Sequence, residues 1–314
     1  MLKRLKRIIN LRYDNKQCIQ RVSFLFKQGY YIFSYDNDKV YRLSLKNIKK
    51  TGLLKSLLFL YYVSNKGQKK EKLIAATIKS GTAKHAVISD SYCYLVFKQP
   101  EKYLLFKKNY FDNIESFNYP AIRPISYNDD LLYIIEPVAK GRTLKDEELP
   151  KLLLFLLELF KSQQQFNKDE NGIIHYVQHN DTLPGNALID EKGNMIFIDL
   201  DVITSRPALF DFFNTICRTY GFNYLLESGK TFCKELEAAF AAHNIKYNES
   251  VYDLYLSKFI EVRLTDLQHG YNNGVLYKSI EWIFYPVAKD KFPLTCELAG
   301  KFRFKSTPEG YKVI

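Results

Sequence analysis

The feature that most constrains the fold of this 314-residue chain is a change of periodicity near residue 139. Between residues 72 and 138, short alternating runs typical of strands surround one stretch with helical spacing. After residue 139, apolar residues recur mainly at helical spacing. The pattern predicts an α+β, bilobal protein, in which a small antiparallel β lobe with one helix precedes a larger, mainly helical lobe.

The small lobe is predicted to contain five strands and one helix. Three strand-like runs come first, then the helix with Pro100 at its first position, then two more runs separated by an Asn-Asp-Asp turn. The runs cover 71–80, 83–90, 91–98, 122–126 and 131–138, and the helix covers 101–117. Lys107 and Lys108 lie in a stretch, YLLFKK, that also fits a strand, but that alternative leaves almost no room for the helix.

The helical lobe is predicted to begin with a buried helix, because residues 152–160 are apolar nearly all round. Thr143, followed by an acid three residues later, suggests a capping box at its start. Two short strands flank a Lys-Gly-Asn turn at 192–194, and helical periodicity then runs from Pro207 to a polar tail after Phe302.

Positive charge is concentrated ahead of both lobes. Residues 1–72 hold 18 Lys and Arg against 4 Asp and Glu, whereas the whole chain has a net charge of +12. We therefore expect a basic N-terminal extension at 1–71, a nucleotide-binding lobe at 72–138 and a catalytic, acceptor-binding lobe at 139–314. The extension should form strands within 22–46 and a short helix at 51–63, which either docks on the protein or lies at an anionic membrane surface.

Several classes of protein are disfavoured. Five cysteines form no CxxC pair, the N-terminus lacks the apolar core of a signal peptide, and the longest apolar run, 57–63, is too short to span a bilayer. We therefore expect a cytoplasmic protein, with peripheral attachment to the inner face of the membrane as the variant that the basic segment leaves open. No P-loop, dinucleotide fingerprint or GxSxG occurs, the histidines lack zinc-site spacing, and no element for reading nucleic acid is evident.

Residues 179–201 carry the most specific chemical signal. His179 and Asp181 are followed by Asn186, and Asp199 lies at the end of the apolar run MIFIDL. Phosphoryl transfer from ATP needs a carboxylate near the attacking hydroxyl and oxygen ligands for Mg²⁺. This spacing can supply both, and His179 would brace the loop.

The segment resembles the H-x-D-x-x-x-x-N catalytic loop and metal-binding Asp of the protein-kinase-like superfamily. The Leu-Pro-Gly-Asn and Ile-Asp-Leu-Asp forms, and the later Phe-Asp-Phe-Phe-Asn at 210–214, are similar to the aminoglycoside phosphotransferase and choline kinase branch. The resemblance implies that Asp181 is the catalytic base or orients the acceptor hydroxyl. It also implies that Asn186 and Asp199 bind Mg²⁺, with Asp201 as a further metal contact or a loop-holding residue.

For ATP binding, the resemblance implies a strand lysine that contacts the phosphates and pairs with a helix glutamate. Lys98 and Glu115 are the expected pair, with Lys107 and Lys108 as competitors. A phosphate-covering turn is expected at Ser80-Gly81-Thr82, although no GxGxxG is present. The Glu136 carbonyl and the Val138 N–H are expected to meet the adenine, and Leu188 and Ile198 to pack against it.

The predicted reaction is therefore MgATP-dependent transfer of the γ-phosphoryl group to a hydroxyl of a small molecule or glycan. Two alternatives remain open at this point: a membrane-associated kinase of a lipid-linked or surface-polysaccharide sugar, and an inactive kinase-like binding protein. The polar residues of the catalytic set are all present, which argues against the inactive form.

Overall fold

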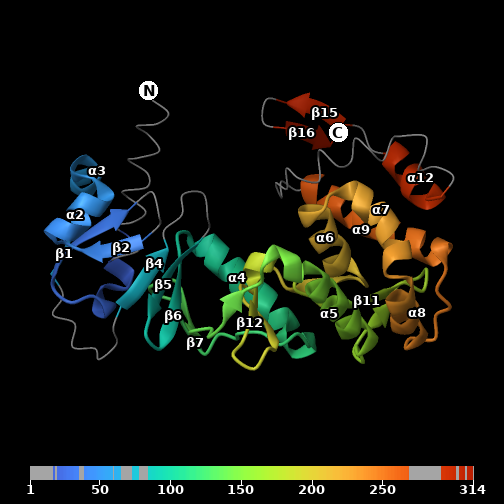
Figure 1. Ribbon diagram of the computed structural model, residues 1–314, viewed down its shortest axis with the longest axis horizontal. Coiled ribbons are helices and arrows are strands. Elements are labelled where there is room, and N and C mark those ends of the chain that lie inside the picture. The colour runs from blue at the N-terminus through green and yellow to red at the C-terminus, as the bar shows by residue number, and fades with distance from the viewer. Residues whose placement is uncertain are drawn as a thin grey trace. The chain divides into compact units, whose positions relative to one another are not determined.

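The computed structural model describes residues 17, 20–34, 39–58, 60–64, 73–77, 84–268, 291–301, 304–307 and 310–313. The chain forms two compact units, one from residues 1–108 and 122–140 and the other from 109–121 and 141–314. Each is described here by itself (Figure 1). The antiparallel sheets of the first unit and the predominance of helices in the second confirm the predicted α+β class.

A five-stranded antiparallel sheet, ordered β4-β5-β6-β8-β7, forms the centre of the first unit. Its strands are β4 (Leu73–Thr77), β5 (Lys84–Ser89), β6 (Tyr92–Phe97), β7 (Ser126–Asn128) and β8 (Tyr133–Pro137). The helix α4 (Pro100–Asn113) follows β6, and the ring centroids of Tyr103 and Phe106 lie 5.5 Å from that of Phe97. The predicted order of strands and helix is thus confirmed.

The segment with Lys107 and Lys108 is helical, which confirms the predicted helix and excludes the alternative strand there. One detail of this unit differs from the predictions. The fourth strand is β7 at 126–128 rather than 122–126, where two prolines interrupt the run: Pro120 lies just before it and Pro124 within it.

The basic N-terminal segment packs on the central sheet. It contains η1 (Ser23–Leu25), β1 (Gly29–Ser34), β2 (Lys39–Arg42), α2 (Leu45–Thr51), α3 (Leu53–Leu58) and β3 (Leu60–Val63), with the strands ordered β2-β1-β3. Its buried residues form one cluster with residues of β5, β6 and β8: Val22, Leu25, Phe26, Tyr31, Val63, Val87, Tyr94, Val96 and Tyr133. The sequence predicted a strand at 22–26 and a helix through 63. Both predictions are wrong there, because η1 is helical and 60–63 pairs with β1.

The second unit is mainly helical. Its helices are α5 (Leu149–Lys161), α6 (Phe210–Thr219), α7 (Phe222–Thr231), α8 (Cys233–Ala241), α9 (Glu249–Gln268) and α12 (Pro293–Lys301). The short elements η2 (Ile114–Ser116), η3 (Asp146–Glu148) and η4 (Pro184–Asn186) complete it. The core of α5 is apolar as predicted, with Leu152, Leu153 and Phe160 fully buried. Among the described residues, no helix is long and apolar enough to cross a membrane.

Two small sheets position the polar loop of this unit. One is β10-β11-β14 (Asn167–Lys168, Ile174–Gln178, Thr204–Pro207), and the other is β13-β12-β9 (Met195–Phe197, Ala187–Ile189, Arg142–Thr143). Thr143 therefore lies in a strand, and the predicted capping box is wrong. Glu148 instead accepts the backbone N–H of Lys145 at 3.1 Å, which is half of a capping box. The expected polar tail after Phe302 includes a hairpin, β15 (Phe304–Thr307) with β16 (Gly310–Val313).

Candidate active site

The loop between β11 and β12 is anchored by a buried carboxylate. Asp211, in the first turn of α6, accepts hydrogen bonds from the backbone N–H groups of His179 (2.9 Å) and Asn180 (2.7 Å). Burial raises the pKa of the Asp211 carboxyl, and the nearby His179 ring and the N–H donors oppose that rise. Because a buried acceptor without donors is costly, these bonds fix both the loop and the start of α6.

His179 braces the loop through both ring nitrogens. Its Nε2 lies 2.9 Å from the Ile198 carbonyl oxygen, so Nε2 carries the ring proton and donates a hydrogen bond to that oxygen. Nδ1 then accepts the N–H of Asp181 at 3.3 Å. The ring is fully buried, with Phe117 and Phe197 as aromatic neighbours. His179 thus holds the backbone of Asp181.

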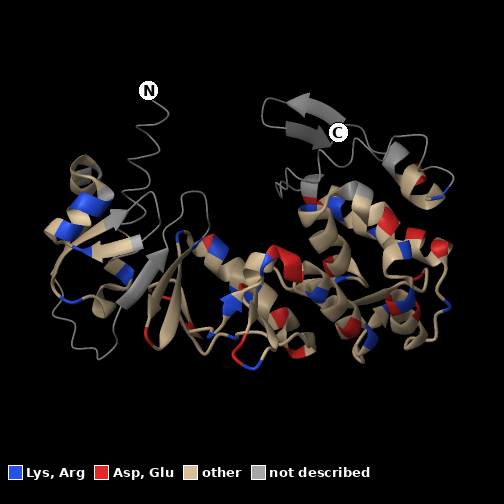
Figure 2. Cartoon of the chain, in the orientation of Figure 1, with Lys and Arg blue, Asp and Glu red and all other residues tan. Residues whose placement is uncertain are grey.

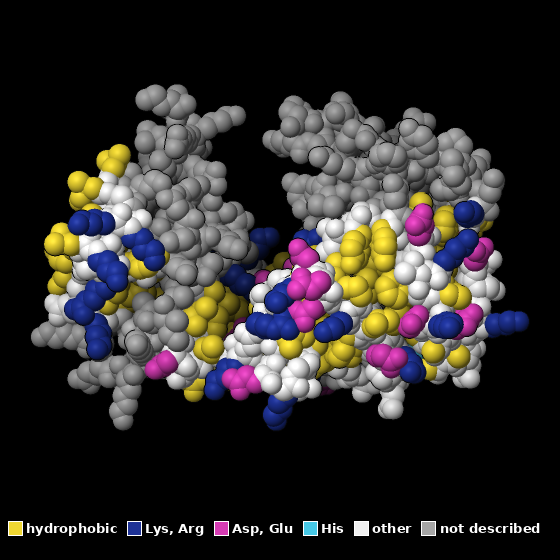
Figure 3. Space-filling model, in the orientation of Figure 1, with side chains coloured by type: hydrophobic (Ala, Val, Ile, Leu, Met, Phe, Trp, Pro, Cys, Tyr) yellow, Lys and Arg dark blue, Asp and Glu magenta, His cyan; other side chains and the backbone are white. Residues whose placement is uncertain are grey.

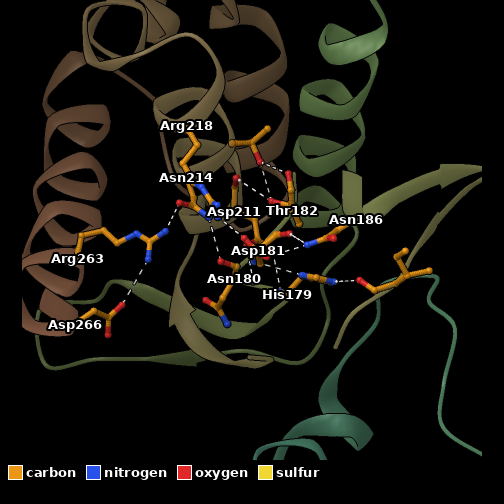
Figure 4. A network of polar contacts seen from close by, with 12 residues as sticks. His179, Asn180, Asp181, Thr182, Asn186, Asp211, Asn214, Arg218, Arg263 and Asp266 are labelled. Atoms are coloured by element: carbon orange, nitrogen blue, oxygen red, sulfur yellow. Dashed lines mark hydrogen bonds and ion pairs between the residues drawn. The ribbon is translucent and has the colours of Figure 1, made fainter. Parts of the chain in front are cut away.

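Asp181 lies at the exposed end of this network, and its two carboxylate oxygens have different partners (Figure 4). Oδ2 accepts a 2.8 Å hydrogen bond from Nδ2 of Asn186, which also donates to the Asp181 carbonyl oxygen at 2.9 Å. Oδ1 is paired with the guanidinium of Arg218, on α6. The Asp181 side chain is 32% exposed, so the carboxylate is accessible to a small molecule.

Asn186 and Asp199 come together at the neighbouring ends of β12 and β13. The Ile198 N–H donates to the Asn186 carbonyl oxygen at 3.0 Å, which places Asp199 one residue beyond this bond. Asp199 has a φ of 69°, a left-handed conformation that is uncommon for an aspartate. Such outliers concentrate at functional sites because surrounding bonds must hold them.

This donor set fits a magnesium ion. Because Nδ2 of Asn186 donates to Asp181, its amide oxygen Oδ1 is the atom left to face a cation, and Asp199 directly follows Ile198, whose N–H bonds to the Asn186 carbonyl oxygen. Mg²⁺ is commonly held by one or two such oxygens together with water and substrate phosphates. In the described part of the chain there is no group of three or more His, Cys, Asp and Glu that could hold a metal by itself. Asp201, two residues on, is partly exposed.

Three arginines of this unit were missed at the sequence level. Arg218 pairs with Asp181, Arg206 donates to Asn180 Oδ1 at 3.3 Å and to Asp266 at 3.2 Å, and buried Arg263 pairs with Asn214 and Asp266. For Arg218 a signal existed, because Asp211, Asn214 and Arg218 recur at helical spacing on one face of α6. Nothing comparable points to Arg206 or Arg263.

In the first unit, the expected lysine lies on the edge of the buried N-terminal cluster. Lys98 directly follows β6, and its charge contributes to the pKa of His85, which burial first of all, and then Lys98 and Arg21, lower to about 3. His85 is buried on β5, on the face that also carries Val87 of the cluster. Lys98 therefore lies near that face.

A second lysine leaves the same end of the sheet. Lys84 of β5 pairs with Phe97 of β6, and its Nζ lies 6.0 Å and 5.8 Å from the ring centroids of Phe97 and Phe106. It thus lies on the α4 side of the sheet. Lys107, by contrast, is on α4 and forms a 2.7 Å ion pair with Asp129.

The remaining residues that were predicted to bind ATP differ in their burial and in the elements that carry them. Val138 N–H donates to the Ser91 carbonyl oxygen at 3.3 Å, so a contact with adenine would have to replace this weak bond. Glu136 lies within β8, opposite Cys93, with its side chain buried.

Leu188 is buried in β12 and Ile198 is partly buried just beyond β13. Glu115 is exposed in η2, which belongs to the second unit. Ser80, Gly81 and Thr82 lie outside the described residues.

Comparisons with known proteins gave only structural likenesses. No family model matches the chain, and no curated protein matches it. A choline/ethanolamine kinase family protein from Mesorhizobium loti has 9% identity and a TM-score of 0.40, covering 73% of this chain and 93% of its own. The choline kinase LicA from Streptococcus pneumoniae has 11% identity and a TM-score of 0.38, with coverages of 73% and 94%.

A third similar structure is the streptomycin–ATP–APH(2")-IIa ternary complex, with 13% identity, a TM-score of 0.37 and coverages of 72% and 93%. These proteins belong to the groups that the motif at 179–201 resembles. At such low TM-scores they carry no argument about this chain, so the conclusions below rest on its own residues.

Proposed function

We propose that this protein is a phosphotransferase that moves the γ-phosphoryl group of MgATP to a hydroxyl of a small molecule or glycan. The observation that carries the proposal is the fixed position of Asp181, whose backbone is held by His179 and whose carboxylate is bracketed by Asn186 and Arg218. A positioned, accessible carboxylate beside a magnesium-type donor set is what such a transfer requires.

Each residue has a distinct role in this proposal. Asp181 orients the acceptor hydroxyl and accepts its proton, and Asn186 and Asp199 hold Mg²⁺, with Asp201 as a further contact. The metal would neutralise charge on the phosphate oxygens. Of the ATP-binding residues expected from the sequence, the proposal assigns Lys98 to the phosphates and Glu136, Val138, Leu188 and Ile198 to the base.

The test is a coupled assay of ADP release with a panel of hydroxyl acceptors, comparing the wild-type chain with Asp181→Ala. We expect acceptor-dependent ADP release that falls at least about 100-fold in the variant, because general-base and orienting groups contribute about 10²–10⁴. ATP binding should persist in both proteins. Unchanged turnover in Asp181→Ala would remove this residue from the reaction.

The competing function, a nucleotide-binding protein without transfer, makes a different prediction. Like the proposed enzyme, it would bind MgATP whether or not Asp181 is present, but no acceptor would stimulate ADP release.

We further propose that the enzyme works at an anionic membrane surface, since α2 and α3 carry an exposed apolar and basic face. Leu45, Leu53, Leu54 and Leu57 are 81%, 64%, 73% and 59% exposed. Lys46, Lys49 and Lys50 are exposed on α2. Figure 2 marks the Lys and Arg positions on these helices in blue, and the space-filling view in Figure 3 shows basic side chains beside hydrophobic ones in the same region. Leucines that insert between lipids, flanked by lysines that meet anionic headgroups, suit such a surface.

Flotation with vesicles of phosphatidylglycerol and phosphatidylcholine at low salt tests the membrane proposal. We expect the wild-type chain to float and Leu54→Ser/Leu57→Ser to remain with the soluble fraction. The matched control is Leu104→Ser/Leu105→Ser on α4, which removes two similarly exposed leucines elsewhere and should float. Equal flotation of both variants, or no flotation of the wild type, would contradict the proposal.

A further inference from the structure

The guanidinium of Arg218 has more donors than the loop uses. A guanidinium carries five N–H donors in a planar fork. Within the described part of the chain, Asp181 is its one hydrogen-bonding partner, reached through a single nitrogen. The Arg218 side chain is 28% exposed, so its remaining donors can meet a ligand.

Arg218 lies on the acceptor side of Asp181. Of the two carboxylate oxygens, Oδ2 faces Asn186, which belongs to the proposed metal set, and Oδ1 faces Arg218 on α6. Figure 4 shows Arg218 and Asn186 approaching Asp181 from different elements. A group held by Arg218 would therefore lie next to the hydroxyl that Asp181 orients, and away from the metal.

The surroundings of Arg218 have an excess of positive charge. Arg206 and Arg263 share a single carboxylate, Asp266, at 3.2 Å and 3.8 Å. The charges of Arg218 and Arg206 both lower the pKa of buried Arg263, whose burial is the main cause of the shift. Among the described residues, the three guanidinium groups of Arg206, Arg218 and Arg263 are thus paired with only two carboxylates, those of Asp266 and Asp181.

Asp211, the other acid that bonds to this loop, does not change this balance at the exposed side. Both oxygens of Asp211 are occupied by backbone N–H groups on the buried side of the loop. Arg263 and Arg206 also flank the ring of Phe210, at 5.1 Å and 5.2 Å, which keeps them in place as fixed charges. An ammonium group on the acceptor would meet this positive field, whereas an anion would be attracted to it.

We propose that the acceptor carries an anionic group, a carboxylate or a phosphate ester, which Arg218 binds beside the hydroxyl that is phosphorylated. This inference rests on the proposed function and narrows its substrate class to acidic or already phosphorylated hydroxyl compounds. A bidentate bond from the free edge of the Arg218 fork is the usual way in which arginine recognises either anion.

Titration with methyl phosphate, a small dianion without a sugar, tests the site directly, and it can be done with or without nucleotide. The probe is followed by calorimetry on the full chain. We expect saturable binding to the wild type, at least 10-fold weaker binding to Arg218→Gln and intermediate binding to Arg218→Lys, which keeps the charge without the fork. The matched control is Arg142→Gln, which removes another carboxylate-paired arginine, bonded to Glu148, and should bind like the wild type.

The variant Asp181→Asn should change the affinity for methyl phosphate in the opposite direction from Arg218→Gln. This difference distinguishes anion recognition by Arg218 from a merely structural role. Loss of the carboxylate leaves Arg218 uncompensated, so methyl phosphate should bind at least 3-fold more tightly while transfer is lost. The inference is overturned if the wild type does not bind the probe, or if Arg218→Gln binds it as well as the wild type does. It is also overturned if Arg218→Gln weakens binding of MgATP relative to MgADP, since Arg218 would then contact the γ-phosphate.

The proposed phosphotransferase activity and the proposed anion site can each fail without the other. If methyl phosphate binds as expected but Mg²⁺ and ATP produce no heat, the anion site stands and the phosphotransferase does not. If acceptors are phosphorylated but glucosamine is preferred over glucuronate, the phosphotransferase stands and the anionic acceptor does not.

Discussion

The loop at 178–186 and the sheet end at Lys84 and Lys98 are organised in different ways. In the loop, Asp181, His179 and Asn186 are fixed by side-chain and backbone hydrogen bonds within one unit. At the sheet end, Lys84 rests over two aromatic rings, and Lys98 lies near a buried histidine. The groups that the proposed reaction would need to orient are thus held in advance, whereas the lysines are long side chains that a ligand could still direct.

Removing the carboxylate that is proposed to bind the metal should have the largest effect on the loop. Asp199→Asn is expected to lower acceptor-dependent ADP release about 10³-fold, because a neutral amide binds Mg²⁺ far more weakly than a carboxylate does. The magnesium dependence of the residual rate, measured from micromolar to millimolar concentrations, should shift to higher concentration. A variant with normal magnesium dependence would show that Asp199 is not a ligand.

Substitution of the lysines should have a smaller effect. We expect Lys98→Ala to lower kcat/KM for ATP about 10²-fold, since one charge-assisted contact to the phosphates contributes a few kcal/mol. Lys84→Ala is the comparison, because both residues leave the same end of β5 and β6. A greater loss in Lys84→Ala would transfer the phosphate role to the residue on the α4 side.

His85 should make the first unit sensitive to acid. The folded protein holds its pKa at about 3 by burial and by the charges of Lys98 and Arg21, whereas the unfolded value is 6.5. The unfolded chain therefore binds the proton first, so this contribution to stability is complete above pH 6.5 and is lost as the pH falls towards 3.

Between pH 7 and 4.5 the loss should be about 2 kcal/mol, and His85→Leu should abolish it. Urea unfolding at a series of pH values measures the difference. If the free energy of unfolding falls equally steeply with decreasing pH in both proteins, His85 does not cause the acid sensitivity.

The smallest predicted effect concerns the ion pair between Arg142 and Glu148 at the start of α5. Hydrogen bonds from Arg142 lower the pKa of Glu148 from 4.5 to about 2. Its contribution to stability is present above pH 4.5 and is lost as the pH falls through about 2. In Arg142→Gln the Glu148 pKa should rise back towards 4.5, which carboxyl-selective NMR titration can follow; an unchanged pKa would contradict this.

The sequence predicted the second unit's loop better than the first unit's details, for a physical reason. His179, Asp181, Asn186 and Asp199 lie close in the chain, so their spacing alone nearly determines their geometry. Arg218 reaches the loop from α6 and is marked only by its helical spacing with Asp211 and Asn214, whereas no local pattern marks Arg206 or Arg263. In the N-terminal segment, 60–63 forms a strand because β1 pairs with it, and such a pairing overrides the local helical pattern.

Calorimetric titration of the full chain with ATP, in the presence and absence of Mg²⁺, tests the central claim most directly. We predict saturable heat with ATP and magnesium together, retained in Asp181→Ala and strongly reduced in Asp199→Asn. No heat from the wild-type protein under any of these conditions, or binding that is indifferent to both magnesium and Asp199, would contradict the account.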